Sequence, residues 1–539
     1  MRFYQPLNLN RCHIYEPPVL GYPGPDGGSA AIFRLRGRLI AIFSMDQGNA
    51  RWISPVNGVE AMGSAYWLAG LLGVAALADI SLVMADSSDP FATNRLVAKS
   101  PVASVAKPAS ALPCRFEGIA QRPLSLSEVV ERALCNNPQT REAWANARVQ
   151  AAQVGVQQSA FWPSVSANAA LTRNETSGSV GSGSGATAYT QESAGLALSY
   201  LLYDFGGRDA SLESARQVLG ALNATQDATI QGVFLSAVQA YYQWFAARAA
   251  VAAAAEAEKF SLESLRAATA RYKVGAATPA DKLQAQTAYS QSVLNRITAE
   301  GNANTALGVL ANAMGLDADA PLSIALAATP RPSEAFAADV ARLIEQARKN
   351  RPDLAAAEAQ VRAARANVDA ARASGMPNVS LTANLGYSNS TISDPFRSSA
   401  LGIMVSIPLF TGFNTTYRIQ AAKEQVEARL AQRDRTSQQV ALDVWKAYQS
   451  LVTQMQALKT SAELVASATQ SEQVARGRYK AGAGTILDLL TAQSALASAR
   501  QQDIQALYGW YIAKAALAQA MGQLDFNAIA ALRAGARQP

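Results

Sequence analysis

The side chains of this chain best suited to binding ions or partners lie in a stretch that occurs twice. Ala270 to Gln286 reads ARYKVGAATPADKLQAQ, and Gly477 to Gln493 reads GRYKAGAGTILDLLTAQ. Each copy combines basic residues, a tyrosine and a carboxylate, a set suited to ion pairs and electrostatic recognition. The sequence has one histidine, His13, so histidine triads and histidine metal sites are excluded from the rest of the chain. We therefore expect no catalytic residue, no metal and no cofactor.

The two copies match at one constant offset, which indicates an internal duplication and therefore a repeated structural unit. The matched pairs are Arg271/Arg478, Tyr272/Tyr479, Lys273/Lys480, Gly275/Gly482, Ala276/Ala483, Thr278/Thr485, Asp281/Asp488, Leu283/Leu490, Ala285/Ala492 and Gln286/Gln493.

Local physical chemistry predicts that each copy is a tight turn between two helices. Basic side chains favour the C-terminal end of a helix, and Gly275 and Gly482 can adopt the left-handed conformation that ends one. Thr278 and Asp281 can then form a capping box for the next helix, as can the matching pair in the second copy. Pro279 falls at the first helical position, where proline is tolerated.

Composition favours long, closely packed helices. Only 16% of residues are charged, against the usual share of about 25%. The net charge of +7 comes without a long run of lysine or arginine, so we expect no nucleic-acid binding. No G-x-x-x-x-G-K-[ST] sequence occurs, which argues against a P-loop.

The first 123 residues have features of an exported protein. Residues 1–61 show no clear period, and we expect them to be absent from the mature protein, because translation starts after Met1 or because they leave with the signal. Residues 62–85 contain the apolar run Ala65 to Ala78 and are predicted to be a signal peptide; a buried core helix is the alternative. Residues 86–123 form a linker rich in serine, proline and alanine. No lipobox cysteine follows, so we expect no lipid anchor.

Two cysteines are placed to form a disulfide. Cys114 lies in the linker and Cys135 in the helix that follows. An oxidising compartment allows them to pair, and a closed loop of this size contributes roughly 3 kcal/mol in the chain-entropy description. Two unpaired thiols are the alternative.

After the linker, the same order of elements is predicted twice, in residues 124–325 and 326–525, before a C-terminal tail over 526–539. Each repeat contains a helix, two strands, a long helix, the turn and a last helix. The expected helices are residues 126–160, 206–273 and 279–314 in the first repeat, with a helix ending near 480 and a helix over 486–521 in the second. A helix of about 100 Å can lie beside two shorter helices placed end to end.

The four predicted strands, each about ten residues long, alternate apolar with small polar side chains, the pattern of membrane strands that line a wet lumen. In the third strand the two faces carry Leu381, Ala383 and Leu385 against Ser380, Thr382 and Asn384. Four strands cannot close a barrel, and open sheet edges are not tolerated in lipid. The chain is therefore expected to oligomerise into a closed barrel, whose apolar face contacts the lipid of the outer membrane.

Over residues 124–524 the chain resembles the TolC-like outer-membrane efflux proteins. The resemblance rests on the doubled R-Y-K-x-G…T-x-x-D-x-L-x-A-Q turn, on the strand pairs after Pro163 and Pro377, and on the Leu-Tyr-Asp-Phe-Gly and Leu-Phe-Thr-Gly segments before the long helices. It implies a mainly α fold with a membrane β-barrel: a homotrimer completes twelve strands, and a long α-helical barrel extends into the periplasm from the outer membrane.

The resemblance also implies partners. The Ala-Leu-Cys-Asn-Asn-Pro sequence at 133–138 looks closest to the branch that serves type I secretion, including export of adenylate cyclase–haemolysin toxins. That branch works with a periplasmic membrane-fusion adaptor and an inner-membrane ABC exporter. The missing lipobox also fits it, whereas the alternative is the outer-membrane component of a multidrug efflux pump.

The resemblance assigns roles to the two turns. Adaptor docking falls on Val274, Gly275, Ala481 and Gly482. The periplasmic entrance falls on Arg271, Tyr272, Asp281, Arg478, Tyr479 and Asp488. For the two aspartates the structural alternative is helix capping alone, and for the two tyrosines it is packing.

Two other classes of protein remain open on the residues alone. A soluble coiled-coil scaffold is favoured if the alternating segments are loops. A secreted enzyme is disfavoured by the absence of histidine and of nucleophile motifs.

Overall fold

A computed structural model describes residues 29–35, 38–46, 49–52, 89–103, 114, 123–180, 183–325, 331 and 339–525. The chain divides into two compact units, Met1–Ser88 and Asp89–Pro539. In the first, β1 (Ser29–Leu35), β2 (Arg38–Asp46) and β3 (Asn49–Trp52) form an antiparallel sheet. The sequence shows no period there, so these strands were not anticipated. The expected signal peptide, residues 62–85, and the tail 526–539 lie outside the described residues.

The second unit repeats one order of elements, as expected from the duplication. After a short 3-10 helix, η1 (Thr93–Leu96), the first repeat contains α2 (Leu126–Asn136), α3 (Pro138–Ser159), β4 (Ser164–Val180), β5 (Gly183–Tyr203), α4 (Gly207–Lys273) and α5 (Pro279–Ala313). The second contains α6 (Val340–Asn350), α7 (Pro352–Ala373), β6 (Asn378–Ser390), β7 (Ser393–Ser406), α8 (Asn414–Ala481) and α9 (Ile486–Ala520).

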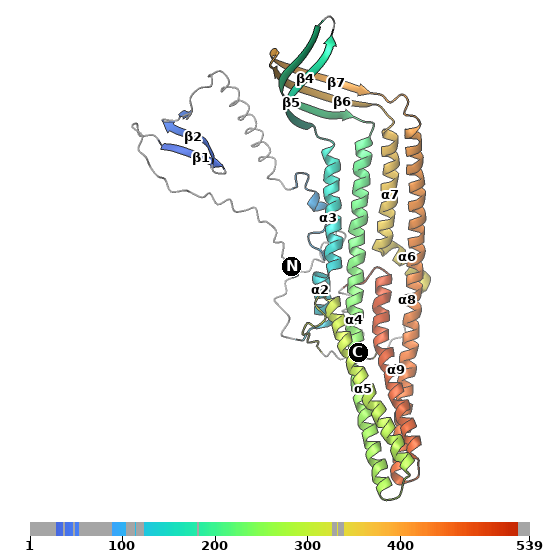
Figure 1. Cartoon of the computed structure of the whole chain (residues 1–539). Coiled ribbons are helices and arrows are strands. Elements are labelled where there is room, and N and C mark those ends of the chain that lie inside the picture. The colour runs from blue at the N-terminus through green and yellow to red at the C-terminus, as the bar shows by residue number, and fades with distance from the viewer. Residues whose placement is uncertain are drawn as a thin grey trace. The chain divides into compact units, whose positions relative to one another are not determined.

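The helices of this unit run side by side, with the four-stranded sheet at one end and the two turns of the duplicated stretch at the other (Figure 1). Neighbouring helices follow the order α3-α4-α7-α8, which matches the sheet order β4-β5-β6-β7. Helix α5 also packs on α4, and α9 packs on α8. Each long helix therefore lies beside two shorter ones, as predicted.

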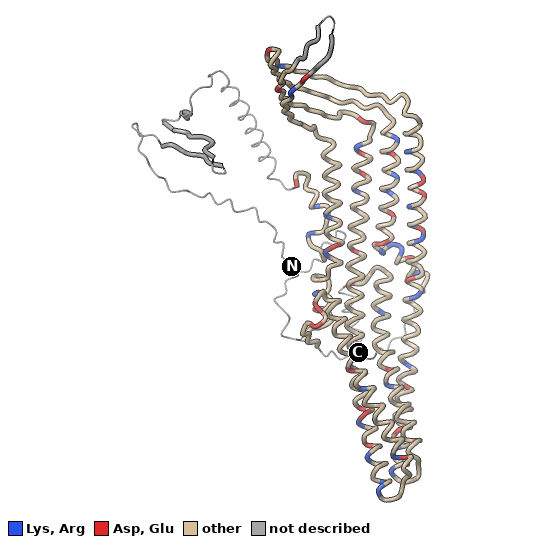
Figure 2. The backbone as a smooth tube through the Cα atoms, viewed as in Figure 1, with Lys and Arg blue, Asp and Glu red and all other residues tan. Residues whose placement is uncertain are grey.

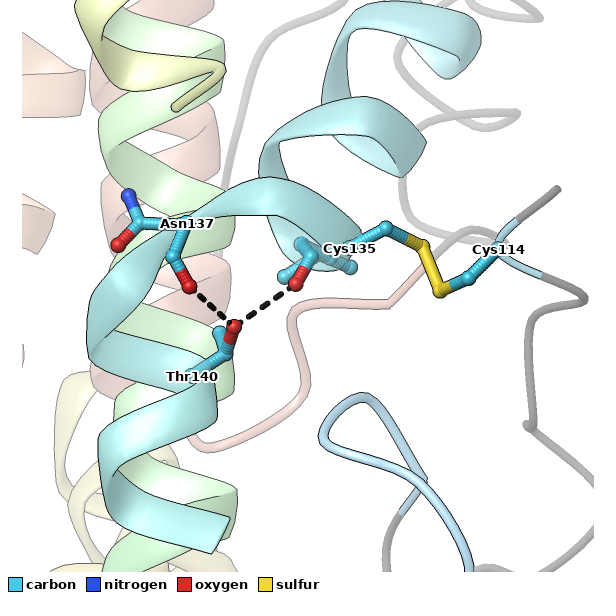
Figure 3. The surroundings of a disulfide bond; sticks show 5 residues. Cys114, Cys135, Asn137 and Thr140 are labelled. Atoms are coloured by element: carbon cyan, nitrogen blue, oxygen red, sulfur yellow. Dashed lines mark hydrogen bonds between the residues drawn. A yellow bond between two sulfur atoms is a disulfide. The ribbon is translucent and has the colours of Figure 1, made fainter. Parts of the chain in front are cut away.

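The helix expected over residues 126–160 is instead two helices, and Pro138 explains the break. Proline has no N–H to continue the helical ladder. The Asn137 side chain accepts a hydrogen bond from the Gln139 N–H at 2.9 Å. The Thr140 hydroxyl donates to the carbonyl oxygens of Leu134 at 2.9 Å and Asn137 at 2.8 Å (Figure 3). The break therefore separates α2 from α3.

Beside this break, a disulfide joins Cys114 to Cys135 (Figure 3). It links the N-terminal segment to α2. Residues 89–103 of the same segment run along α3 and α4, where the Trp144 indole donates to the Ala98 carbonyl at 2.8 Å. The buried amide of Gln226 donates to the carbonyls of Pro101 and Ala103. The disulfide therefore adds a covalent link to a segment that hydrogen bonds from side chains of α3 and α4 also hold in place.

The sheet separates apolar from small polar residues in register. Val165, Leu198, Ala383 and Leu401 lie opposite one another across the four strands, whereas the preceding row is Ser164, Ser199, Thr382 and Gly402. The strands have 17, 21, 13 and 14 residues, so the expected length of about ten residues was too short. Within the described residues, β4 and β7 each pair on one side only.

The main core lies in the middle of the helical body, where α2, α4, α8 and α9 meet. Its centre is aromatic: the Tyr242 ring stacks on that of Tyr511 with centroids 4.8 Å apart, and Phe245 and Tyr508 lie beside them. Burial, with a smaller effect of Tyr508, raises the pKa of Tyr511 to about 12. In the part of the chain that the structure describes, no helix is both long and apolar enough to cross a membrane.

Candidate functional site

The two turns of the duplicated stretch, hereafter the tip turns, have the same backbone geometry. Gly275 and Gly482 have φ angles of 76° and 82°, the left-handed region that favours glycine. The Ala276 N–H donates to the Arg271 carbonyl at 2.8 Å, and the Ala483 N–H donates to the Arg478 carbonyl at 2.9 Å. The predicted helix-ending role of both glycines is therefore confirmed.

Both aspartates of the tip turns complete capping boxes, as the sequence predicted. The Thr278 N–H donates to Asp281 Oδ2 at 2.8 Å, and the Thr485 N–H donates to Asp488 Oδ2 at 3.1 Å. Hydrogen bonds from the Thr485 backbone and hydroxyl, together with the charge of Arg478, lower the pKa of Asp488. Each carboxylate is thus engaged at the start of its own helix, α5 or α9.

One contact joins the two tip turns. The Arg271 guanidinium lies 4.6 Å from the centre of the Tyr479 ring, a cation–π distance. Tyr479 is buried in a small cluster with Ala268, Ile486 and Leu489, and its hydroxyl has no hydrogen-bond partner among the described residues. Tyr479 therefore packs between the two hairpins, α4–α5 and α8–α9.

The matching tyrosine of the first copy is placed differently. Tyr272 is 41% exposed, and the ammonium of Lys282 lies 5.6 Å from its ring centre. The duplicated sequence therefore produces one buried and one exposed tyrosine, because only Tyr479 faces the other hairpin. This asymmetry was not evident from the repeat alone.

The positions expected to dock an adaptor are accessible. Val274 is 77% exposed, and Gly275, Ala481 and Gly482 are also exposed. They lie at the end of the helical body that is farthest from the sheet (Figure 1). Their exposure is compatible with docking.

A buried polar layer lies a few turns from the tip turns, and sequence reasoning missed it. Glu472 is only 2% exposed. Its Oε1 accepts hydrogen bonds from the Arg476 guanidinium at 2.7 Å and from the Gln493 amide at 3.4 Å. Gln493 also contacts the Ser264 hydroxyl, and the Arg476 guanidinium covers the Phe260 ring at 4.4 Å. This layer links α4, α8 and α9.

The only sequence signal of this layer was Gln493, the last position of the duplicated stretch. Its counterpart Gln286 is exposed, so the repeat did not reveal the buried role. Elsewhere in the described residues, no group of three or more histidine, cysteine or acidic residues could hold a metal ion.

Comparison with known proteins gives a consistent result. The family model described as "Outer membrane efflux protein" matches residues 129–316 and 343–523. Protein CyaE of Bordetella pertussis is 31% identical over 431 residues, covering 79% of this chain and 89% of that protein. The probable efflux pump outer membrane protein TtgC of Pseudomonas putida is 27% identical over 390 residues, covering 70% and 78%. The Campylobacter jejuni CmeC outer membrane channel superposes with a TM-score of 0.68 at 19% identity, covering 76% and 89%.

These matches confirm the expected family, the mainly helical fold with a four-stranded sheet and the location in the outer membrane. They identify a passive channel of tripartite export systems and exclude the two other readings, a soluble scaffold and a secreted enzyme. The chain belongs to the outer membrane efflux protein family.

Proposed function

We propose that three copies of this chain form one export duct. The observation that carries this proposal is the shared order of strands and helices, β4-β5-β6-β7 and α3-α4-α7-α8, with an unpaired strand at each edge of the described sheet. Pairing β7 of one copy with β4 of the next removes both open edges, as a membrane requires. Three copies complete twelve strands, and their helices continue the wall into the periplasm.

The tip turns then surround the periplasmic opening of the duct. We assign adaptor docking to Val274, Gly275, Ala481 and Gly482, which are exposed there. An inner-membrane ABC exporter supplies the energy, because a passive channel has no chemistry of its own. The entrance residues are those of the two turns: Arg271, Tyr272, Asp281, Arg478, Tyr479 and Asp488.

The cargo proposed is a type I secreted protein. Support comes from the similarity to CyaE, which spans 89% of that protein, and from the resemblance of residues 133–138 to the secretion branch. A toxin of the adenylate cyclase–haemolysin type is the specific cargo that this resemblance suggests. The second candidate is drug efflux, which the similarity to the efflux pump protein TtgC supports.

Deletion of the gene in its native host tests both. For type I secretion, one large protein disappears from the culture medium while the minimal inhibitory concentrations of drugs stay unchanged. For drug efflux, those concentrations fall and secretion is normal. The assembly is tested separately, by electrophoresis of unheated and heated outer-membrane fractions. A protein that migrates as a monomer before heating, and stays monomeric after chemical cross-linking, would exclude the proposed trimer.

A further inference from the structure

We infer that the tip turns form a basic rim that favours acidic over basic polypeptide at the opening of the duct. This inference rests on the proposed function. The two tip turns and the helix ends beside them carry five basic side chains, Arg271, Lys273, Lys282, Arg478 and Lys480, against two acidic ones, Asp281 and Asp488. Figure 2 shows lysine and arginine at this end of the helices.

The acidic charges of the rim are already engaged. Asp281 and Asp488 each accept the N–H of a capping threonine, and they lie at the positive N-terminal ends of α5 and α9. The positive end of a helix offsets a carboxylate held there. The two aspartates therefore oppose the basic side chains only weakly.

Three of the basic side chains have local contacts. Arg271 covers the Tyr479 ring, Lys282 lies over Tyr272, and Arg478 donates to the Ala483 carbonyl at 3.2 Å. These contacts give the three residues a structural role within the tip turns.

Lys273 and Lys480 have no such role. Both are exposed, and among the described residues neither takes part in a hydrogen bond, ion pair or ring contact. They occupy matched positions directly before the two turns. The helix dipole favours a cation there, yet the last turns of α5 and α9 contain no basic residue. The dipole therefore permits the two lysines but does not require them.

A rim of like charges attracts molecules of opposite charge and repels molecules of the same charge as they approach the opening. At physiological salt the screening length is about 8 Å, so a charge on either wall of a narrow opening is felt across much of it. An opening lined by one sign of charge concentrates the opposite sign by about tenfold or more. The described sheet carries two basic and three acidic side chains, Arg173, Arg397, Glu175, Glu192 and Asp394, so the opposite end of the unit has no surplus of positive charge.

The test uses purified full-length trimers in planar bilayers under a KCl gradient. The parent is expected to have a reversal potential that favours Cl⁻. The double variant Lys273→Gln/Lys480→Gln should lower this preference, and Lys273→Glu/Lys480→Glu should move the reversal potential toward K⁺. Lys349→Glu, the same charge change on α6, is the control and should behave like the parent.

Poly-L-glutamate and poly-L-lysine of equal length, added on the side of the tip turns, probe the polypeptide directly. Poly-L-glutamate should block the parent current at a concentration about tenfold lower than poly-L-lysine, and the glutamate variant should reverse this order. A parent that prefers K⁺, or tip variants with unchanged selectivity and block, would overturn the inference and assign the lysines to the outer, partner-facing surface. If the protein forms no trimers and conducts no current, both the proposed function and this inference are overturned.

Discussion

Glu472 is a buried carboxylate in a part of the molecule where most buried neighbours are alanine and leucine. A buried charge is tolerated only when it is paired and hydrogen-bonded. Arg476 supplies the pairing through two bonds to the same oxygen, at 2.9 and 2.7 Å. Because Gln493 on α9 and Ser264 on α4 complete the layer, it fixes how the two hairpins sit against each other near the tip turns.

Glu472→Ala should therefore loosen the ends of the hairpins. Arg476 loses its acceptor, and removing one partner of a buried hydrogen bond costs about 1–3 kcal/mol. Thermal unfolding and limited proteolysis near the tip turns measure the effect. Glu472→Gln keeps an oxygen acceptor and should lose less than half as much. If the alanine variant is as stable and as protease-resistant as the parent, the layer does not hold the hairpins together.

A second pair of glycines has a more demanding role than those of the tip turns. Gly315 and Gly522 have φ angles of 71° and 70°. A Cβ at these positions would lie 2.7 Å from the Asn136 carbonyl oxygen and 2.8 Å from that of Asn350. Both glycines follow the tip glycines at equal spacing in the two repeats. This spacing was available from the sequence, but the close backbone approach that makes it matter was not.

Gly315→Ala and Gly522→Ala should each lower the free energy of unfolding by about 1–3 kcal/mol, because both the backbone conformation and the contact become strained. Gly301→Ala is the matched control: Gly301 lies within α5, and a Cβ added there would have no atom within 4 Å, so alanine should stabilise by about 0.5–1 kcal/mol. The temperature of trimer dissociation reports both changes. Equal effects at all three positions would show that the helix ends do not press on the breaks between α2 and α3 and between α6 and α7.

Among the elements, the helices were the easiest to predict. The bounds of α4, α5, α8 and α9 follow from cap residues and glycines that act locally. The break at Pro138 was missed although proline has no N–H for the helical ladder and ends or kinks a helix at the preceding residue. The strands proved longer than expected, since pairing with neighbours extends them beyond the alternating residues. Tertiary contacts, such as the buried layer around Glu472, left no local pattern to find.

The disulfide between Cys114 and Cys135 ties the segment before α2 to that helix. Cys114→Ser/Cys135→Ser should destabilise the chain by roughly 3 kcal/mol through the freed loop. Thermal unfolding with and without a reductant measures this loss, and the reductant should have no effect on the double variant. Non-reduced peptide mass spectrometry of protein from the outer membrane checks the pairing. Free thiols that alkylate on both cysteines would contradict it.

The two faces of the sheet are predicted to differ in how well they tolerate a charged side chain. Leu381 lies in register with Tyr200 and Ile403, whereas Thr382 lies beside Ser199 and Gly402. If the first face meets lipid, Leu381→Lys should cost about 2–4 kcal/mol near the midplane, and Thr382→Lys should cost much less. The amount of heat-modifiable trimer in outer-membrane fractions compares the two variants. Equal tolerance of lysine on both faces would reject the assignment of the apolar face to lipid.

At the scale of the whole molecule, the two repeats are similar in order but not in surroundings. Helix α4 contacts α3, α5, α7 and α9, whereas α8 packs mainly on α7 and α9 and on the short helix α6. The half of α8 that is nearer the sheet is largely exposed, as expected of an edge that meets another copy. The duplication could be predicted from the sequence, but the central position of α4 could not, because it depends on which hairpin packs over the other.

The position and exposure of the tip turns bear on how the proposed duct engages its export partners. If α4 and α8 each span about 100 Å, Gly275 and Gly482 lie at the far end of the proposed duct, where we propose that an adaptor docks. No atom lies within 4 Å of a Cβ built at Gly275, and only the Arg271 guanidinium approaches one at Gly482. A side chain at either position would therefore project from the surface, where it would obstruct a docked partner.

Gly275→Leu and Gly482→Leu should abolish export of the cargo while heat-modifiable trimers still assemble in the outer membrane. Leucine also strains the left-handed backbone, so Gly275→Asn and Gly482→Asn are the matched variants, since asparagine tolerates that conformation. If docking requires a bare turn, the asparagine variants also lose export, and cross-linking to the adaptor falls with it. If they export and cross-link like the parent, backbone strain explains the leucine result and docking lies elsewhere. Normal export by the leucine variants would remove the tip turns from the docking surface altogether.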